Sequence, residues 1–174
     1  RTDPAQTLEM AMHNLKRSEE LTYEKGIAWS KGNMGAAYIW LSEYDKAIEC
    51  NYEAVELLHD CGEYQQEVQI EYYLFIVFYF LNDEEKQLEH VQKSHDRAVE
   101  IGDVRGQANA LNGIGTVHYT FNRHQDAINA LEEGLSVADG LEDPSLFGRI
   151  YNGLGNAYFG LGQLEKALDT MEKA

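Results

Sequence analysis

Apolar and polar positions along the chain alternate with the spacing of amphipathic helices. Apolar residues recur three positions apart, as in Tyr38 and Leu41, which places them on one face of a helix. Only two prolines occur, Pro4 and Pro144, each where a helix is expected to begin. The pattern therefore predicts helix over nearly the whole chain.

The periodic segments predict nine helices separated by short breaks. Their expected ranges are 4–22, 26–41, 44–60, 64–81, 84–101, 104–121, 124–139, 144–161 and 164–174. No linker is rich in Gly, Ser or Pro, so we expect one repeat domain over 1–174. It is expected to consist of a leading helix, 4–22, and repeats at about 26–61, 64–101, 104–141 and 144–174.

A period of 40 residues relates these segments. Four columns show it: Gly35, Phe75, Gly115 and Gly155; Tyr38, Phe78, His118 and Tyr158; Leu41, Leu81, Phe121 and Leu161; and Ala47, Gln87, Ala127 and Ala167. Small residues that recur on paired helices let two backbones approach closely, so they indicate packing. Phe75 and Gln87 interrupt two of the columns and predict that the second repeat packs more loosely or tilts differently.

The chain resembles the tetratricopeptide repeat (TPR) family. The residues that match the family pattern are Leu154, Gly155, Tyr158 and Ala167, with Gly35 and Ala47, and Gly115 and Ala127, in earlier repeats. The unit here is 40 residues long, against about 34 in the usual repeat. The resemblance implies an all-α, right-handed α-solenoid of antiparallel helix pairs, with about nine helices.

In TPR arrays the first helix of each pair lines a concave groove, and the resemblance assigns that role to columns of this chain. The peptide- or protein-binding groove is expected to contain Trp29, Ile39, Trp40, Tyr72, Ile76, Tyr79, Asn109, Asn112, Thr116, Arg149, Asn152 and Asn156. Amide side chains can both donate to and accept from a peptide backbone, and aromatic ones supply contact area. The aromatic residues could equally belong to the core between repeats.

Two details refine the expected groove. Chaperone-binding TPR proteins carry Lys and Asn at positions that are Gly32 and Ala36 here, which argues against that type of partner. Arg149 is the only strong cation in the expected groove, and it could pair with an acidic ligand group or with a neighbouring acidic side chain.

The charge balance excludes several classes of partner. The chain has 14 Lys and Arg against 30 Asp and Glu, a formal net charge of −16. A nucleic-acid groove or a basic membrane-binding surface needs clustered cations, so neither is expected. Acidic residues concentrate in 43–63 and 132–143, on second helices and their exits. We interpret them as a solvated face, with attraction of a basic partner as the alternative.

Motifs for catalysis or metal binding are not found in the sequence. The six histidines form no metal-binding spacing, and Cys50 and Cys61 lie outside any Cys-x-x-Cys or Cys/His cluster. The chain is therefore expected to be no enzyme and to need no cofactor. Free thiols suit a reducing, cytoplasmic location. The longest apolar run, Ile70–Leu81, is 12 residues and too short for membrane insertion.

Two functions follow from this sequence. The first is a protein–protein interaction scaffold that binds a peptide or helical segment in its groove. The alternative is a sensory or regulatory segment of a larger signalling protein, a kinase, cyclase or transcription regulator, with the output domain outside this chain. Its motivation is that the chain begins at Arg1 and ends in an open helix, as a piece of a longer protein would. Self-association through the terminal repeats is a further possibility.

Overall fold

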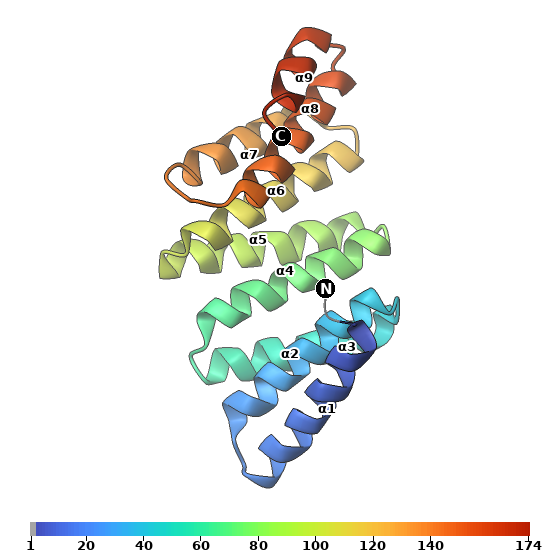
Figure 1. Cartoon of the computed structure of the whole chain (residues 1–174), viewed down its shortest axis with the longest axis vertical. Coiled ribbons are helices and arrows are strands. Elements are labelled where there is room, and N and C mark those ends of the chain that lie inside the picture. Colours follow the sequence, from blue (N-terminus) through green and yellow to red (C-terminus); the bar gives the residue numbers. More distant parts are fainter. Residues whose placement is uncertain (1–2) are drawn as a thin grey trace. The chain divides into compact units, whose positions relative to one another are not determined.

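The computed structural model describes residues 3–174, and α-helices are the only regular elements in that range (Figure 1). The nine helices of the described chain are α1 (Pro4–Glu20), α2 (Glu24–Trp40), α3 (Tyr44–Asp60), α4 (Tyr64–Phe80), α5 (Glu84–Ile101), α6 (Val104–Thr120), α7 (His124–Val137), α8 (Pro144–Gly160) and α9 (Leu164–Met171). The predicted all-α fold is confirmed, and no predicted helix end is more than three residues from the observed one.

Turns of one kind join the helices and set the length of the repeat. A residue with positive φ occurs every 20 positions, at Thr22, Ser42, Gly62, Asn82, Gly102 and Asn122, and again at Gly162. At Asn82 the backbone N–H donates to the Tyr79 carbonyl at 3.1 Å, and the next N–H, of Asp83, donates to Phe78 at 3.0 Å. This Schellman ending satisfies carbonyls that the helix leaves open. After α7 the turn differs, because the positive φ falls at Gly140.

Acidic residues stand at the starts of the first helices, one repeat apart. The carboxylates of Asp103 and Asp143 accept from the backbone N–H groups three residues later, at 2.9 and 3.1 Å. Such caps stabilise a helix by about 1 kcal/mol. Asp143 also pairs with Arg105 at 3.4 Å, and Glu63 pairs with Lys25 in the same relative position. The column of Glu63, Asp103 and Asp143 therefore supplies either a cap, an ion pair or both.

Contacts between the helices group the chain into two compact units. Unit 1 reaches to Arg97 and unit 2 runs from Ala98 to Ala174. In unit 1, α2 packs against α1, α3 and α4, and in unit 2, α8 packs against α6, α7 and α9. Consecutive helices within each unit run antiparallel (Figure 1). That both units form the single domain expected from the sequence stays a prediction.

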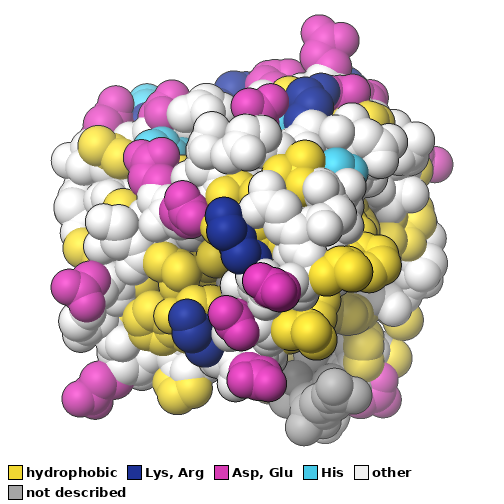
Figure 2. All heavy atoms as spheres, turned by 90° about the horizontal axis from the view of Figure 1, so that it is seen from above, with side chains coloured by type: hydrophobic (Ala, Val, Ile, Leu, Met, Phe, Trp, Pro, Cys, Tyr) yellow, Lys and Arg dark blue, Asp and Glu magenta, His cyan; other side chains and the backbone are white. Residues whose placement is uncertain are grey.

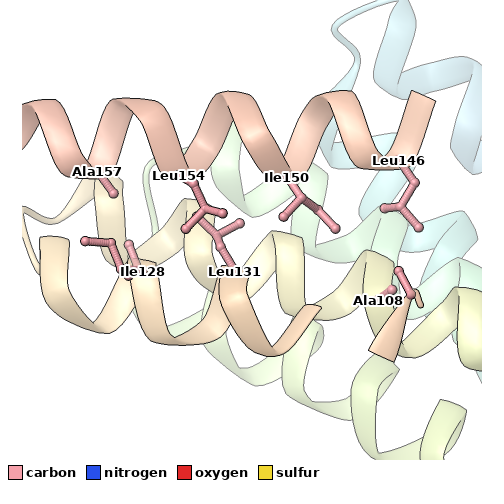
Figure 3. Close-up of a cluster of buried hydrophobic side chains, with 9 residues drawn as sticks. Ala108, Ile128, Leu131, Leu146, Ile150, Leu154 and Ala157 are labelled. Carbon is pink, nitrogen blue, oxygen red and sulfur yellow. The ribbon is translucent and has the colours of Figure 1, made fainter. Parts of the chain in front are cut away.

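The core of unit 2 is apolar and closely packed. Leu146, Ile150 and Leu154 extend from α8 into one cluster, in which Leu154 lies beside Leu131 and Ile128 of α7 and Leu146 points toward Ala108 of α6 (Figure 3). All six are at most 3% exposed. Their spacing of four residues along α8 places them on one helical face, as the sequence pattern predicts.

Glycines allow the helix pairs of unit 2 to approach this closely. A Cβ added at Gly115 would lie 2.5 Å from Cγ of Leu131, and one at Gly155 would lie 2.6 Å from Cγ of Met171. Both distances are far below van der Waals contact. The recurring glycines are therefore packing residues, and the interpretation made from their column is confirmed.

The core of unit 1 contains polar side chains at equivalent positions. Asn51 stands at the position that Leu131 occupies in unit 2. It is fully buried against Gly35, and neither its Oδ1 nor its Nδ2 has a hydrogen-bond partner. Phe75 and Gln87 are also buried, and Nε2 of Gln87 donates to the Phe78 carbonyl at 3.2 Å. The second repeat thus holds both large residues in its interior. Looser packing or a different tilt of this repeat stays a prediction.

Candidate functional site

The expected groove residues lie on two surfaces, one in each unit. The aromatic face of unit 1 consists of Trp29, Trp40, Tyr72, Ile76 and Tyr79 on α2 and α4. The amide face of unit 2 consists of Asn109, Thr116, Arg149, Asn152 and Asn156 on α6 and α8. Each face is built from first helices, because the same helical positions recur one repeat later.

Large rings remain exposed on the aromatic face. Trp40 is 76% exposed, Trp29 49% and Tyr79 41%. Tyr79 contacts the buried Phe75 at 6.4 Å between ring centroids, and Phe75 contacts Tyr72 at 5.2 Å. Some aromatic residues of this region therefore belong to the core, and others are free to contact a ligand. The sequence left these two roles open, and burial separates them residue by residue.

A cleft of about 740 Å³ lies beside Trp40, in the size range of small-ligand sites. It is lined by the start of α1, the second half of α2 and the middle of α4. The lining residues are Asp3, Pro4, Thr7, Asn33, Ala36, Ala37, Trp40 and Tyr73. Of these, only Ala36 and Trp40 stand in the expected groove columns. The residues at the start of α1 line the cleft because of the way α1 packs against α2, which the columns do not describe.

Hydrogen bonds connect the amide face across two helices. Nη2 of Arg149 donates to Oδ1 of Asn109 at 2.7 Å, one full repeat earlier, and Nη1 donates to Oγ of Ser145 at 3.1 Å. Nδ2 of Asn156 donates to Oδ1 of Asn152 at 2.9 Å. These bonds of Arg149 go to neutral groups of its own unit, and pairing with an acidic group of a ligand stays a prediction.

Two residues of the expected groove are buried. Ile39 is 5% exposed and packs with Ala47 and Val77 in a core cluster. Asn112 is 8% exposed, and its backbone carbonyl accepts from the hydroxyl of Thr116 at 2.8 Å. A column position places a side chain on a helix face, but the neighbouring helix decides how far it is covered. Contact of these two residues with a ligand stays a prediction.

A buried polar cluster in unit 1 was not predicted. His90 is fully buried, with Nδ1 2.8 Å from Oε2 of Glu71 and Nε2 2.9 Å from the Tyr52 hydroxyl. With Nδ1–H donating to the carboxylate, Nε2 accepts the hydroxyl proton of Tyr52, so a neutral imidazole with one ring proton can form both bonds. Phe78 stacks on the imidazole at 5.3 Å. Burial raises the pKa of Tyr52 above its ordinary value. The sequence signal was Glu71, the one charge within the apolar run.

Acidic side chains are mostly exposed. Figure 2 shows them spread over the face seen from above, among exposed hydrophobic groups and fewer basic ones. Glu49, Glu56 and Glu132, from the two acidic stretches, are exposed. Glu67 differs, since it is 6% exposed and accepts from Nε of Arg97 at 3.1 Å. The acidic stretches therefore have the exposure expected of a solvated face.

Metal-binding and membrane-spanning features were also sought in residues 3–174. In that range no three or more His, Cys, Asp and Glu side chains gather where they could hold a metal ion. None of the described helices combines the length and apolar character of a membrane span. Cys50 and Cys61 are free thiols, and burial raises the pKa of Cys50.

Comparison with known proteins places this architecture. The model of the tetratricopeptide repeat family matches residues 148–174, which comprise most of α8 and all of α9. No curated protein matches the chain in sequence. Among solved structures, BtubC (BKLC) from P. vanneervenii is similar with a TM-score of 0.76 and 14% identity, over 99% of this chain and 90% of that one.

Two further structures have the same fold. Aspartyl phosphate phosphatase F from Bacillus subtilis is similar with a TM-score of 0.81 and 15% identity, over 98% of this chain and 49% of that one. A structure of nearly identical TPR-like repeats from Podosopora anserina has a TM-score of 0.74 and 12% identity, over 98% of this chain and 84% of that one.

The helix pairs and their exposed first-helix faces define a helical-repeat protein. The family model covers the last helix pair, and the neighbours share the helical-repeat fold, so both agree with the predicted resemblance to the tetratricopeptide repeat family.

Proposed function

We propose that this protein is an interaction scaffold that binds a peptide or a helical segment of a partner protein on its first-helix faces. The observation that carries the proposal is the bond from Arg149 to Asn109, two residues in the same column one repeat apart. It joins α6 and α8 into one polar row rather than two separate helix surfaces. A row of this kind follows the direction in which an extended ligand would lie.

The amide face has hydrogen-bonding groups to spare. Asn156 uses one N–H of its amide toward Asn152, which leaves the oxygen of Asn156 and the nitrogen of Asn152 for a ligand. These groups match the carbonyl and N–H of a peptide backbone. The face can therefore hold a segment through its main chain, with specificity from side chains supplied elsewhere.

Peptide selection followed by substitution tests the proposal. Peptides are selected from a displayed random library on the full chain, and their affinities are measured by fluorescence anisotropy. The double variant Asn152→Ala/Asn156→Ala is expected to lose about 5- to 100-fold in affinity, which corresponds to about 1–3 kcal/mol for unmade hydrogen bonds.

Asn129→Ala is the matched control. Asn129 is an exposed asparagine on the second helix α7, and its Oδ1 accepts from Gln125 four residues earlier at 3.1 Å, as Asn152 accepts from Asn156. Its loss should leave affinity unchanged. An equal effect of both variants, or no effect of the double variant on any selected peptide, would refute the role of the amide face.

A regulatory segment of a larger signalling protein is the second candidate. The observation in its favour is that the chain matches about half of aspartyl phosphate phosphatase F, with 49% of that chain covered. Sequencing the coding region on both sides of these 174 residues tests it. An adjoining kinase, cyclase or DNA-binding domain would favour this candidate, and stop codons close to both ends would remove it.

A further inference from the structure

The cleft of unit 1 combines aromatic rings with a single charge. Of its lining residues, Trp40 and Tyr73 carry rings, Pro4, Ala36 and Ala37 are apolar, and Asp3 is the one charged residue among those described. The cleft is formed where the start of α1 lies against the second half of α2. It therefore depends on tertiary packing and has no counterpart in the repeat columns.

The rings around the cleft are arranged to contact a ligand. Trp40 is 76% exposed, the largest exposed fraction among the large apolar side chains of the described chain. Tyr73 is half-buried, and its hydroxyl accepts from Nε2 of Gln69 at 2.7 Å, which holds the ring in place. An exposed indole beside a fixed phenol gives the cleft an apolar contact surface for a ligand.

The carboxylate of Asp3 remains available beside these rings. Oδ1 of Asp3 accepts from the Ala5 N–H at 3.1 Å, as a helix cap does, and among the described residues the group forms no ion pair. The whole chain carries a net charge of −16. An anionic ligand would be repelled both by Asp3 and by this overall field.

We propose that the cleft binds a lysine or arginine side chain of a peptide partner. The cationic head lies against the face of Trp40 and pairs with the Asp3 carboxylate, while the aliphatic stem packs on Ala36 and Ala37. The inference rests on the proposed function as a peptide-binding scaffold and adds the chemistry of the segment that is recognised. It concerns unit 1 alone.

Tryptophan fluorescence can test the cleft directly, because the chain has only two tryptophans, Trp29 and Trp40. In the full chain with Trp29→Phe, Trp40 is the sole reporter. The probes are acetylated pentapeptides of alanine with a central lysine, arginine, norleucine or glutamate. Lysine and arginine are expected to give a saturable change in emission and to bind about 5-fold tighter than norleucine, with no binding of the glutamate peptide.

Two substitutions that each remove one negative charge separate the cleft from the general field. Asp3→Asn keeps a side chain that caps α1 well and should weaken the lysine probe by about 5-fold. Asp45→Asn, at an exposed position in the first turn of α3, should change it by less than about 2-fold. Circular dichroism of both variants checks that the helices are intact.

Three outcomes would overturn the inference. Equal binding of norleucine and lysine would make the cleft an apolar site, and equal losses in both aspartate variants would reduce the effect to overall charge. Unchanged Trp40 emission with every probe would show that nothing of this kind enters the cleft. Each result would leave the proposed function standing if Asn152→Ala/Asn156→Ala still weakens the selected peptides, because those residues lie in unit 2.

Discussion

In unit 2 the paired helices meet where glycines face Leu131 and Met171, whereas in unit 1 the position equivalent to Leu131 is occupied by the buried Asn51. The contrast extends to a second pair of positions. Glu71 and His90 of unit 1 are hydrogen-bonded and buried, and one repeat later the chain has the buried residues Leu111 and Ala130. One repeat pattern thus supports two kinds of interior.

The difference indicates which substitutions should destabilise each unit. An apolar interior tolerates little extra volume, since its packing is as dense as a crystal. A polar interior tolerates little loss of a hydrogen-bond partner, because a buried group left unpaired has lost its hydrogen bonds to water and gains none in the protein. The two units are therefore expected to fail through opposite kinds of substitution.

Removing the imidazole from unit 1 should have the largest effect. His90→Ala leaves the Glu71 carboxylate buried without its partner and opens a cavity, so the free energy of unfolding is expected to fall by about 3 kcal/mol. Urea denaturation followed by circular dichroism measures it. The double variant Glu71→Leu/His90→Ala copies the residues of unit 2 and should recover most of the loss. If it is no more stable than the single variant, the polar pairing is not the reason for the sensitivity.

Adding one methyl group to unit 2 should have the next largest effect. Gly115→Ala places a Cβ 2.5 Å from Leu131 and forces α6 and α7 apart, so we expect a loss of about 2 kcal/mol. Gly134→Ala is the matched control on α7, where the added Cβ would lie 3.3 Å from its nearest neighbour. The better helix propensity of alanine should offset that contact. Similar melting temperatures for both variants would show that close approach at Gly115 is unimportant.

Exchanging the two interiors at one position should have the smallest effect. Asn51→Leu introduces the residue that unit 2 has opposite Gly115, and it removes an amide that is buried without hydrogen bonds. The protein is expected to gain about 1 kcal/mol in stability, visible as a higher melting temperature. The reverse exchange, Leu131→Asn, should destabilise. A loss of stability in Asn51→Leu would mean that this amide has a role in unit 1 beyond filling space.

Much of the local structure was predictable from the sequence because it is periodic. A turn with positive φ recurs every 20 residues from Thr22 to Asn122, and Gly35 and Gly115 stand in the same column, where two helices must approach. Such features depend on one helix and its nearest partner, so each repeat supplies an independent instance of the same signal. This is why the helix ranges and the packing role of the glycines could be predicted together.

The candidate site was predictable only in part. Trp40 and Asn152 are exposed on first helices as expected, but Ile39 and Asn112 are covered by neighbours. A column assigns a direction to a side chain, and exposure depends on the size and tilt of the helix packed beside it. The presence of Asp3 in the lining of the cleft could not be predicted for the same reason, since its position depends on how α1 packs against α2.

The sequence by itself determined the class of fold, the repeat length, the helix pairs and the excess of acidic groups, because these depend on composition and on spacing along one chain. Tertiary structure alone decided which polar groups are buried together, as Glu71 and His90 are, and which aromatic rings remain exposed around the cleft. Hydrogen bonds between residues from different helices act over about 3 Å, and no periodicity along the sequence specifies distances of that size.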